Sequence, residues 1–192
     1  LFQLLGCPFD AMGATMATYC GQNVGACRLD RLGQGIRSCS LLGLAYAVMA
    51  FCAMLVFADP CAMLFLNPSE PQLDLLVSLT SRYVTSVTAF FFPLALVNII
   101  RFSIQGMGYS SFAILAGVLE MAARAGVGLG LVPVFGYTAV CVASPAAWIA
   151  ADLFLVPAAF ACIRKLRKMY PNQPEPPLPA QAETPPPAGA VD

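Results

Sequence analysis

The sequence contains no histidine, and only 10% of its 192 residues are charged. Histidine is the commonest general base and metal ligand, so its absence argues against most hydrolases and metalloenzymes. Soluble domains carry roughly 25% charged residues, so the low charge argues against an ordinary water-soluble protein. Ten Lys and Arg balance ten Asp and Glu, which leaves too few bases for binding nucleic acid.

Catalytic motifs are also missing from the sequence. It has no H-E-x-x-H, no G-x-S-x-G, no Walker-type glycine loop and no dinucleotide fingerprint. None of the eight cysteines forms a C-x-x-C pair, and most stand in apolar runs, as small buried side chains do. We therefore expect neither an enzyme nor a resident cofactor, and any energy source would be an ion gradient or another subunit.

What the sequence does contain is apolar surface, with 59% hydrophobic residues and a mean hydropathy of +0.75. A helix needs about 20 apolar residues to cross roughly 30 Å of hydrocarbon. Helices are expected because an open strand would leave backbone groups unpaired in lipid. Five stretches qualify, near residues 4–25, 41–58, 77–100, 109–133 and 138–163. The predicted fold class is an all-α integral membrane protein, a polytopic helix bundle.

Turn-forming residues predict where these spans end. The predicted breaks contain Gly33 with Gly35, Asp59-Pro60, residues 67–71, Gly106 with Gly108, and Gly136. Residues 61–66 are apolar but too short to cross, so we expect them to lie in the membrane interface. Pro93 is expected to interrupt the third span, and Pro145 and Pro157 to kink the fifth.

The charges at alternate breaks predict the orientation, because Lys and Arg concentrate on the cytoplasmic side. Bases follow the first span (Arg28, Arg31, Arg37), the third span (Arg101) and the fifth span (Arg164, Lys165, Arg167, Lys168). Acids follow the second span (Asp59, Glu70, Asp74). Arg82, in the first turn of the third span, is an exception that can snorkel to the interface. This places the C-terminus in the cytoplasm and Leu1 outside. Since no signal peptide precedes Leu1, we expect a C-terminal fragment of a longer membrane protein.

The end of the chain differs in composition from residues 1–168, the predicted transmembrane lobe. Eight of the sixteen prolines lie within residues 171–192, together with three acids and no base. Such a composition cannot build a packed core, so residues 169–192 are predicted to be a disordered, proline-rich cytoplasmic tail. Its P-x-x-P spacings leave a partner domain as an alternative.

Charged residues at membrane depth are the first site candidates, because each costs about 2.5–3.5 kcal/mol near the bilayer centre. Glu120 lies in the fourth span, and Arg124 follows one turn later, where the two can form an ion pair. The carboxylate either lines a water-filled cavity, where it exchanges a proton or holds a cation, or locks its helix against a neighbour. Asp152 in the fifth span either faces a transport pathway or forms a salt bridge to Arg124.

Polar residues of the third span extend the candidate pathway. Asn98, Arg101 and Gln105 are spaced i, i+3, i+7 and share one face, which we expect to line a cavity near the cytoplasmic side. Hydroxyls of its outer half, including that of Tyr83, bind either a ligand or a neighbouring helix. The alternate glycines of residues 126–130 permit flexibility or close helix packing, and we expect packing.

Residues 19–31 read Y-C-G-Q-N-V-G-A-C-R-L-D-R. This element resembles the G-Q-N-x-G-A-G-x-x-x-R motif of the prokaryotic multidrug and toxic compound extrusion (MATE) family, with Cys27 where the family usually has Gly. The element contains Gln22, Asn23, Gly25, Arg28 and Arg31. Further agreement comes from R-x-x-x-Q-G-x-G at 101–108, Glu120-x-x-x-Arg124, Gly136, and Ser144-Pro145-x-x-Trp148. Together these cover about residues 1–168.

The resemblance implies the eighth to twelfth helices of a twelve-helix antiporter, with the first lobe and the seventh helix missing from this chain. Such a transporter would export amphipathic or cationic xenobiotics in exchange for Na⁺ or H⁺ across the inner (plasma) membrane of a prokaryote. Within it, Glu120 would be a cavity or gating carboxylate, and Asn98, Gln105 and Asp152 would face the cavity. A lipid-linked saccharide flippase of the same superfamily and a non-transporting membrane scaffold stay open as alternatives.

Overall fold

The structure is a computed structural model, and it describes residues 2–64 and 71–170. Within these ranges the chain forms helices and short turns, with no strand. The predicted all-α membrane bundle is therefore confirmed. The turn expected at residues 67–70, the interfacial position of residues 65–66 and the tail from residue 171 onward lie outside the described residues.

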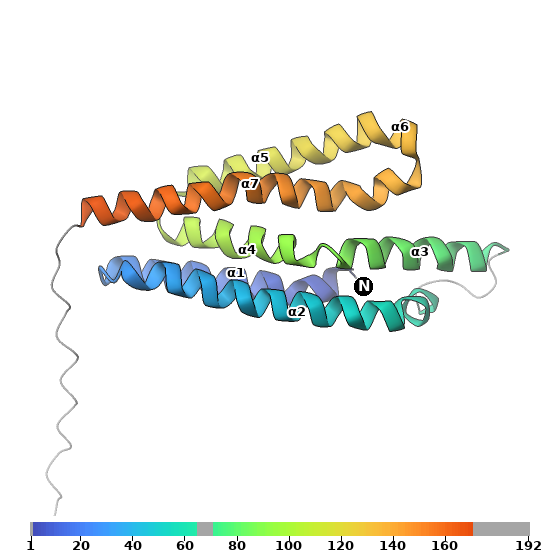
Figure 1. Cartoon of the computed structure of the whole chain (residues 1–192), viewed down its shortest axis with the longest axis horizontal. Helices are drawn as coiled ribbons and strands as arrows, with labels where there is room; N and C mark the ends of the chain where they lie inside the picture. Colours follow the sequence, from blue (N-terminus) through green and yellow to red (C-terminus); the bar gives the residue numbers. More distant parts are fainter. Residues whose placement is uncertain (1, 65–70, 171–192) are drawn as a thin grey trace, which may run out of the picture.

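Each predicted span corresponds to one rod of helix, and the rods lie side by side along the molecule (Figure 1). In chain order the elements are α1 (Phe2–Gly25), α2 (Asp30–Met63), α3 (Leu73–Thr88), α4 (Phe91–Gly106), α5 (Ser110–Gly126), the π-helix η1 (Val127–Leu131), α6 (Val132–Phe135) and α7 (Tyr137–Met169). Three rods are long and apolar enough to cross a membrane, namely α2, α5 to α6, and α7, and the bent pair α3–α4 makes a fourth. The first rod, α1, is more polar and is not among them.

Helix α2 is longer than predicted at both ends. Gly33 and Gly35 do not break the chain but lie in the first turns of α2, and the turn comes earlier, at residues 26–29. Asp59 and Pro60 do not open a loop either, since the helix continues through Cys61 to Met63. The Asp59 carboxylate accepts a hydrogen bond from the Ser81 hydroxyl of α3. Packing of α2 against α3 thus holds a helical end that local propensity disfavours.

The third span is interrupted close to Pro93, as predicted. Helix α3 ends at Thr88, α4 begins at Phe91, and the two are bent by 49°. Pro93 stands in the first turn of α4, where its missing N–H has no helical partner to lose. Pro145 and Pro157 lie inside α7, which runs unbroken, and Gly136 with φ 56° separates α6 from α7.

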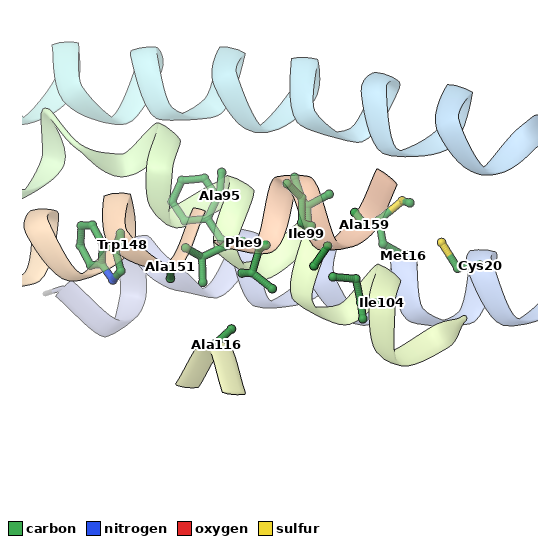
Figure 2. Close-up of a cluster of buried hydrophobic side chains, with 14 of the residues drawn as sticks. Phe9, Met16, Cys20, Ala95, Ile99, Ile104, Ala116, Trp148, Ala151 and Ala159 are labelled. Atoms are coloured by element: carbon green, nitrogen blue, oxygen red, sulfur yellow. The ribbon is translucent and has the colours of Figure 1, made fainter. Parts of the chain in front are cut away.

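Helix α4 is the centre of the bundle and packs against α1, α2, α5 and α7. The α1–α4 crossing is close, because a Cβ added to Gly106 would collide with the backbone of Ala17. Buried side chains from α1, α4 and α7 meet around α4, among them Phe9, Ile99 and Trp148 (Figure 2). This tight core fixes the relative positions of the helices that carry the polar residues.

Basic residues collect at one end of the bundle. The turns at 26–29 and 107–109 and the last turns of α7 lie at this end, which we call the basic end, and Asp59 and Asp74 lie at the other (Figure 1). Arg82 is not in a first turn as predicted but near the middle of α3, since α3 begins at Leu73. Its guanidinium donates a hydrogen bond to the Thr138 hydroxyl at 3.3 Å.

Candidate functional site

The polar residues at membrane depth gather where α4 lies between α1 and α5. On α4, Asn98 borders a pocket shared with α1, and Arg101 forms an ion pair with α5. Gln105, one turn further toward the basic end, is exposed. We call this surface the polar face; its residues are Gln3 and Asp10 of α1, Asn98, Arg101 and Gln105 of α4, and Glu120 and Arg124 of α5.

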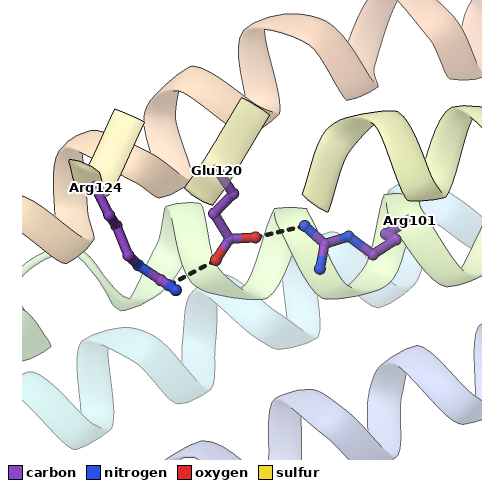
Figure 3. Close-up of polar contacts among 3 residues, drawn as sticks. All are labelled: Arg101, Glu120 and Arg124. Carbon is purple, nitrogen blue, oxygen red and sulfur yellow. Dashed lines mark hydrogen bonds and ion pairs between the residues drawn. The ribbon is translucent and has the colours of Figure 1, made fainter. Parts of the chain in front are cut away.

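The carboxylate of Glu120 lies between two guanidinium groups (Figure 3). Its Oε1 accepts from Arg124 Nη2 at 2.6 Å, which is the predicted pair on the same helix. Its Oε2 accepts from Arg101 Nη2 at 2.5 Å, and this pair joins α5 to α4. The side chains of Arg101 and Glu120 are 22% and 12% exposed, whereas that of Arg124 is 47% exposed. The inner pair is therefore the stronger one, because it is less screened.

This geometry bears on the two interpretations of Glu120. Both carboxylate oxygens already accept charge-assisted hydrogen bonds, and two positive charges surround one negative charge. A third cation would have to displace a guanidinium to reach the carboxylate. The arrangement therefore favours a helix clasp over an open cation site, and the clasp holds α4 to α5 in this conformation.

Asp152 of α7 does not pair with Arg124, so that alternative is wrong; Arg124 reaches Glu120 on its own helix instead. Among the described residues, two buried side-chain atoms lack a hydrogen-bond partner, Asp152 Oδ1 and Arg101 Nε. The charges that act on Asp152 are those of Arg101 and Glu120. A free donor and a free acceptor in one charge cluster leave room for a second arrangement of its ion pairs.

A pocket of ≈ 160 Å³ lies between α1 and α4 beside this cluster. It is lined by Phe2, Gln3, Gly6, Asp10, Leu94 and Asn98. Asp10 was not among the predicted site residues, although it lies in the first predicted span and meets the membrane-depth criterion that selected Glu120. The pocket offers a carboxylate, two carboxamides and an aromatic ring, a combination that suits an organic cation.

Two other predictions concern residues away from the polar face. Tyr83 is partly buried on α3, across the 49° break, and packs against the hydrophobic core. The neighbouring Thr88 hydroxyl donates to its own helix, at Val84 O.

The glycines of residues 126–130 have no other atom within 4 Å of an added Cβ, so the expected close packing is wrong. Two of them, Gly128 and Gly130, lie in the five-residue π-helix η1, which widens the rod locally.

The glutamine-asparagine element forms the turn between α1 and α2. Asn23 Nδ2 donates to Tyr19 O at 2.8 Å, and the Arg28 N–H donates to Asn23 O at 2.8 Å. The Tyr19 hydroxyl donates to Arg31 O at 3.1 Å, which ties the two helices together. Cys27, where the family usually has glycine, has φ 57°. The departure seen in the sequence therefore falls at a backbone conformation that favours glycine.

Comparison with known proteins agrees with this architecture. The family model described as MatE matches residues 1–129, from α1 into η1, which includes every residue of the polar face. No curated protein and no solved structure matches the chain. Because the matched region covers more than half of the chain, the protein belongs to the MatE family of membrane transporters.

Proposed function

We propose that this chain is one lobe of a secondary active exporter, which moves amphipathic, cationic compounds out of the cell in exchange for Na⁺ or H⁺. The observation that carries the proposal is the polar face, an acidic pocket beside an ion-pair clasp on an otherwise apolar bundle. Each charge would cost about 2.5–3.5 kcal/mol against lipid, so such a face suits a water-accessible path. A second lobe opposite this face would enclose the path.

The pocket between α1 and α4 would receive the charged part of the substrate. Asp10 supplies the counter-charge, while Phe2 and Leu94 supply apolar walls for an amphipathic body. A volume of ≈ 160 Å³ is small beside the roughly 300–1,000 Å³ of drug-sized sites. The rest of the substrate would therefore lie along the polar face and against the second lobe.

The clasp of Arg101, Glu120 and Arg124 would act as a gate rather than as the cation site. Alternating access needs contacts that form in one state and open in the other. Glu120 holds Arg101 in the present state, and Asp152 has a buried Oδ1 without a hydrogen-bond partner and interacts electrostatically with both of these residues. Exchange of Arg101 between these two carboxylates would let α4 move relative to α5 and α7.

The basic end supports the proposed orientation in a prokaryotic plasma membrane. Lys and Arg at the 26–29 turn and in the last turn of α7 would face the cytoplasm. A flippase for a lipid-linked saccharide is less well supported, because Arg101 and Arg124 are the bases of the polar face and both are engaged by Glu120. A diphosphate group would need free bases.

The proposal is tested by dye efflux from cells that lack their own exporters and carry the full-length protein. We expect Asp10→Asn to reduce efflux of a cationic dye by about tenfold or more, because the substrate loses a charge-assisted contact. Asp74→Asn is the matched control, since Asp74 is exposed in the first turn of α3, away from the polar face. Equal efflux by Asp10→Asn and the unsubstituted protein at equal membrane levels would show that the pocket is not the substrate site.

A further inference from the structure

A second, larger hollow lies on the side of α4 turned away from the polar face. It has a volume of ≈ 420 Å³ and is bounded by α2, α4 and α7. We call it the groove; its residues are Gly33, Ile36, Arg37, Ser40, Leu96, Ile100, Val156, Ala159, Phe160 and Ile163. Leu96 and Ile100 form its floor on α4. At 100° per residue they point away from Asn98, so the groove and the pocket lie on opposite sides of α4.

We propose that the groove binds one anionic phospholipid, with an acyl chain between α2 and α7 and the phosphate at Arg37. The walls are almost entirely apolar, and the Ser40 hydroxyl is already used, since it donates to Ile36 O of its own helix at 2.8 Å. Arg37 is the one charged residue of the lining and is exposed at the rim. An acyl chain matches the walls, and a phosphate matches the guanidinium.

The position of Arg37 along α2 fits a lipid headgroup. The helix begins at Asp30, so Arg37 lies about 10 Å along its axis from the basic end. The helix has 34 residues, well over the roughly 20 needed to cross the hydrocarbon, so its first turns can stand among the headgroups. From Gly33 to Ser40 the groove runs about 10 Å along α2, enough for the upper part of an acyl chain.

Of the charged residues near this end, Arg37 is the one that lines the groove, which makes it the residue that selects the headgroup. The ion pairs of the described residues are both at Glu120, on the polar face. Lys165 Nζ lies 5.3 Å from the centroid of the Tyr109 ring, at the α4–α5 turn. Gly33 is exposed, and an added Cβ would meet nothing within 4 Å, so its missing side chain keeps the rim open beside Arg37.

The test is native mass spectrometry of the full-length protein, titrated with phosphatidylglycerol or phosphatidylcholine of identical acyl chains. We expect a one-to-one adduct that favours phosphatidylglycerol by about fivefold, the contribution of one base near an anionic lipid. Arg37→Gln should remove this preference. Arg31→Gln, also exposed on α2 but outside the groove, should keep it. Gly33→Leu fills the groove and should weaken binding of both lipids.

Three results would overturn the assignment. They are equal retention of the two lipids by the unsubstituted protein, an unchanged preference in Arg37→Gln, or a peptide or second protein chain as the bound species. All three substitutions are at exposed positions. If Gly33→Leu nevertheless fails to fold, the pair Arg37→Gln and Arg31→Gln decides the question alone. Lipid binding is measured without transport, so the result does not depend on the proposed exporter function.

Discussion

The two sides of α4 have opposite chemistry within a helix of only 16 residues. Toward α1 and α5 it presents Asn98 and Arg101, which border an acidic pocket and join an ion-pair clasp. Toward α2 and α7 it presents Leu96 and Ile100, the floor of an apolar groove. Because these residues alternate along the same few turns, depth in the bilayer does not explain the difference. Under the two proposals above, the difference follows from the neighbour of each side, which would be a water-accessible path on one and a lipid on the other.

We expect the largest loss of stability from removing the central carboxylate of the polar face. Glu120→Leu leaves Arg101, at 22% exposure, without its partner, and we expect a loss of about 3 kcal/mol in the free energy of unfolding. Arg124→Leu removes the outer partner, which is 47% exposed, and should cost about 1 kcal/mol or less. Unfolding curves in detergent measure both. Equal losses would mean that the inner pair does not clasp α4 to α5.

We expect a smaller change in stability from substitutions in the close α1–α4 contact, which also positions Asp10. Gly106→Ala places a methyl group against the Ala17 backbone and should destabilise the protein by about 2 kcal/mol. Gly33→Ala, on the groove side, meets open space and should instead stabilise α2 by up to about 1 kcal/mol. The thermal midpoints of the two variants should therefore move in opposite directions. A gain of stability in Gly106→Ala would contradict the close α1–α4 contact.

The smallest expected effect concerns the turn that leads from α1 to α2. Cys27 has φ 57°, so Cys27→Gly should raise the free energy of unfolding by about 1 kcal/mol. Cys52→Gly, an exposed position inside α2, should lower it by a similar amount, because glycine weakens a regular helix by about 1 kcal/mol. Thermal unfolding of both variants measures the contrast. If both substitutions change the free energy of unfolding in the same direction, the backbone at Cys27 is not strained.

The helical class, the five rods and the Glu120–Arg124 pair could be predicted from the sequence, because each depends on local spacing or on length. The Arg101–Glu120 pair could not, since it joins residues of different helices whose approach is set by packing. The same holds for α2, where contacts with α3 extend a helix past Asp59 and Pro60. Asp10 could have been selected from the sequence, since it is a charged residue inside a predicted span. Its pocket could not be predicted, because the pocket forms where α1 crosses α4, and residue spacing does not reveal that crossing.

The central claim is that one side of α4 is accessible to water and the other is not. The most direct test is to measure water access to both sides in native membranes. In a full-length protein without its native cysteines, a membrane-impermeant thiol reagent is applied to Asn98→Cys and to Leu96→Cys. The two positions are two residues apart at the same depth, on the pocket and the groove respectively. We predict that Asn98→Cys reacts about tenfold faster, since thiol chemistry needs an accessible thiolate, and that a cationic dye slows it. Equal rates at the two positions would contradict the account.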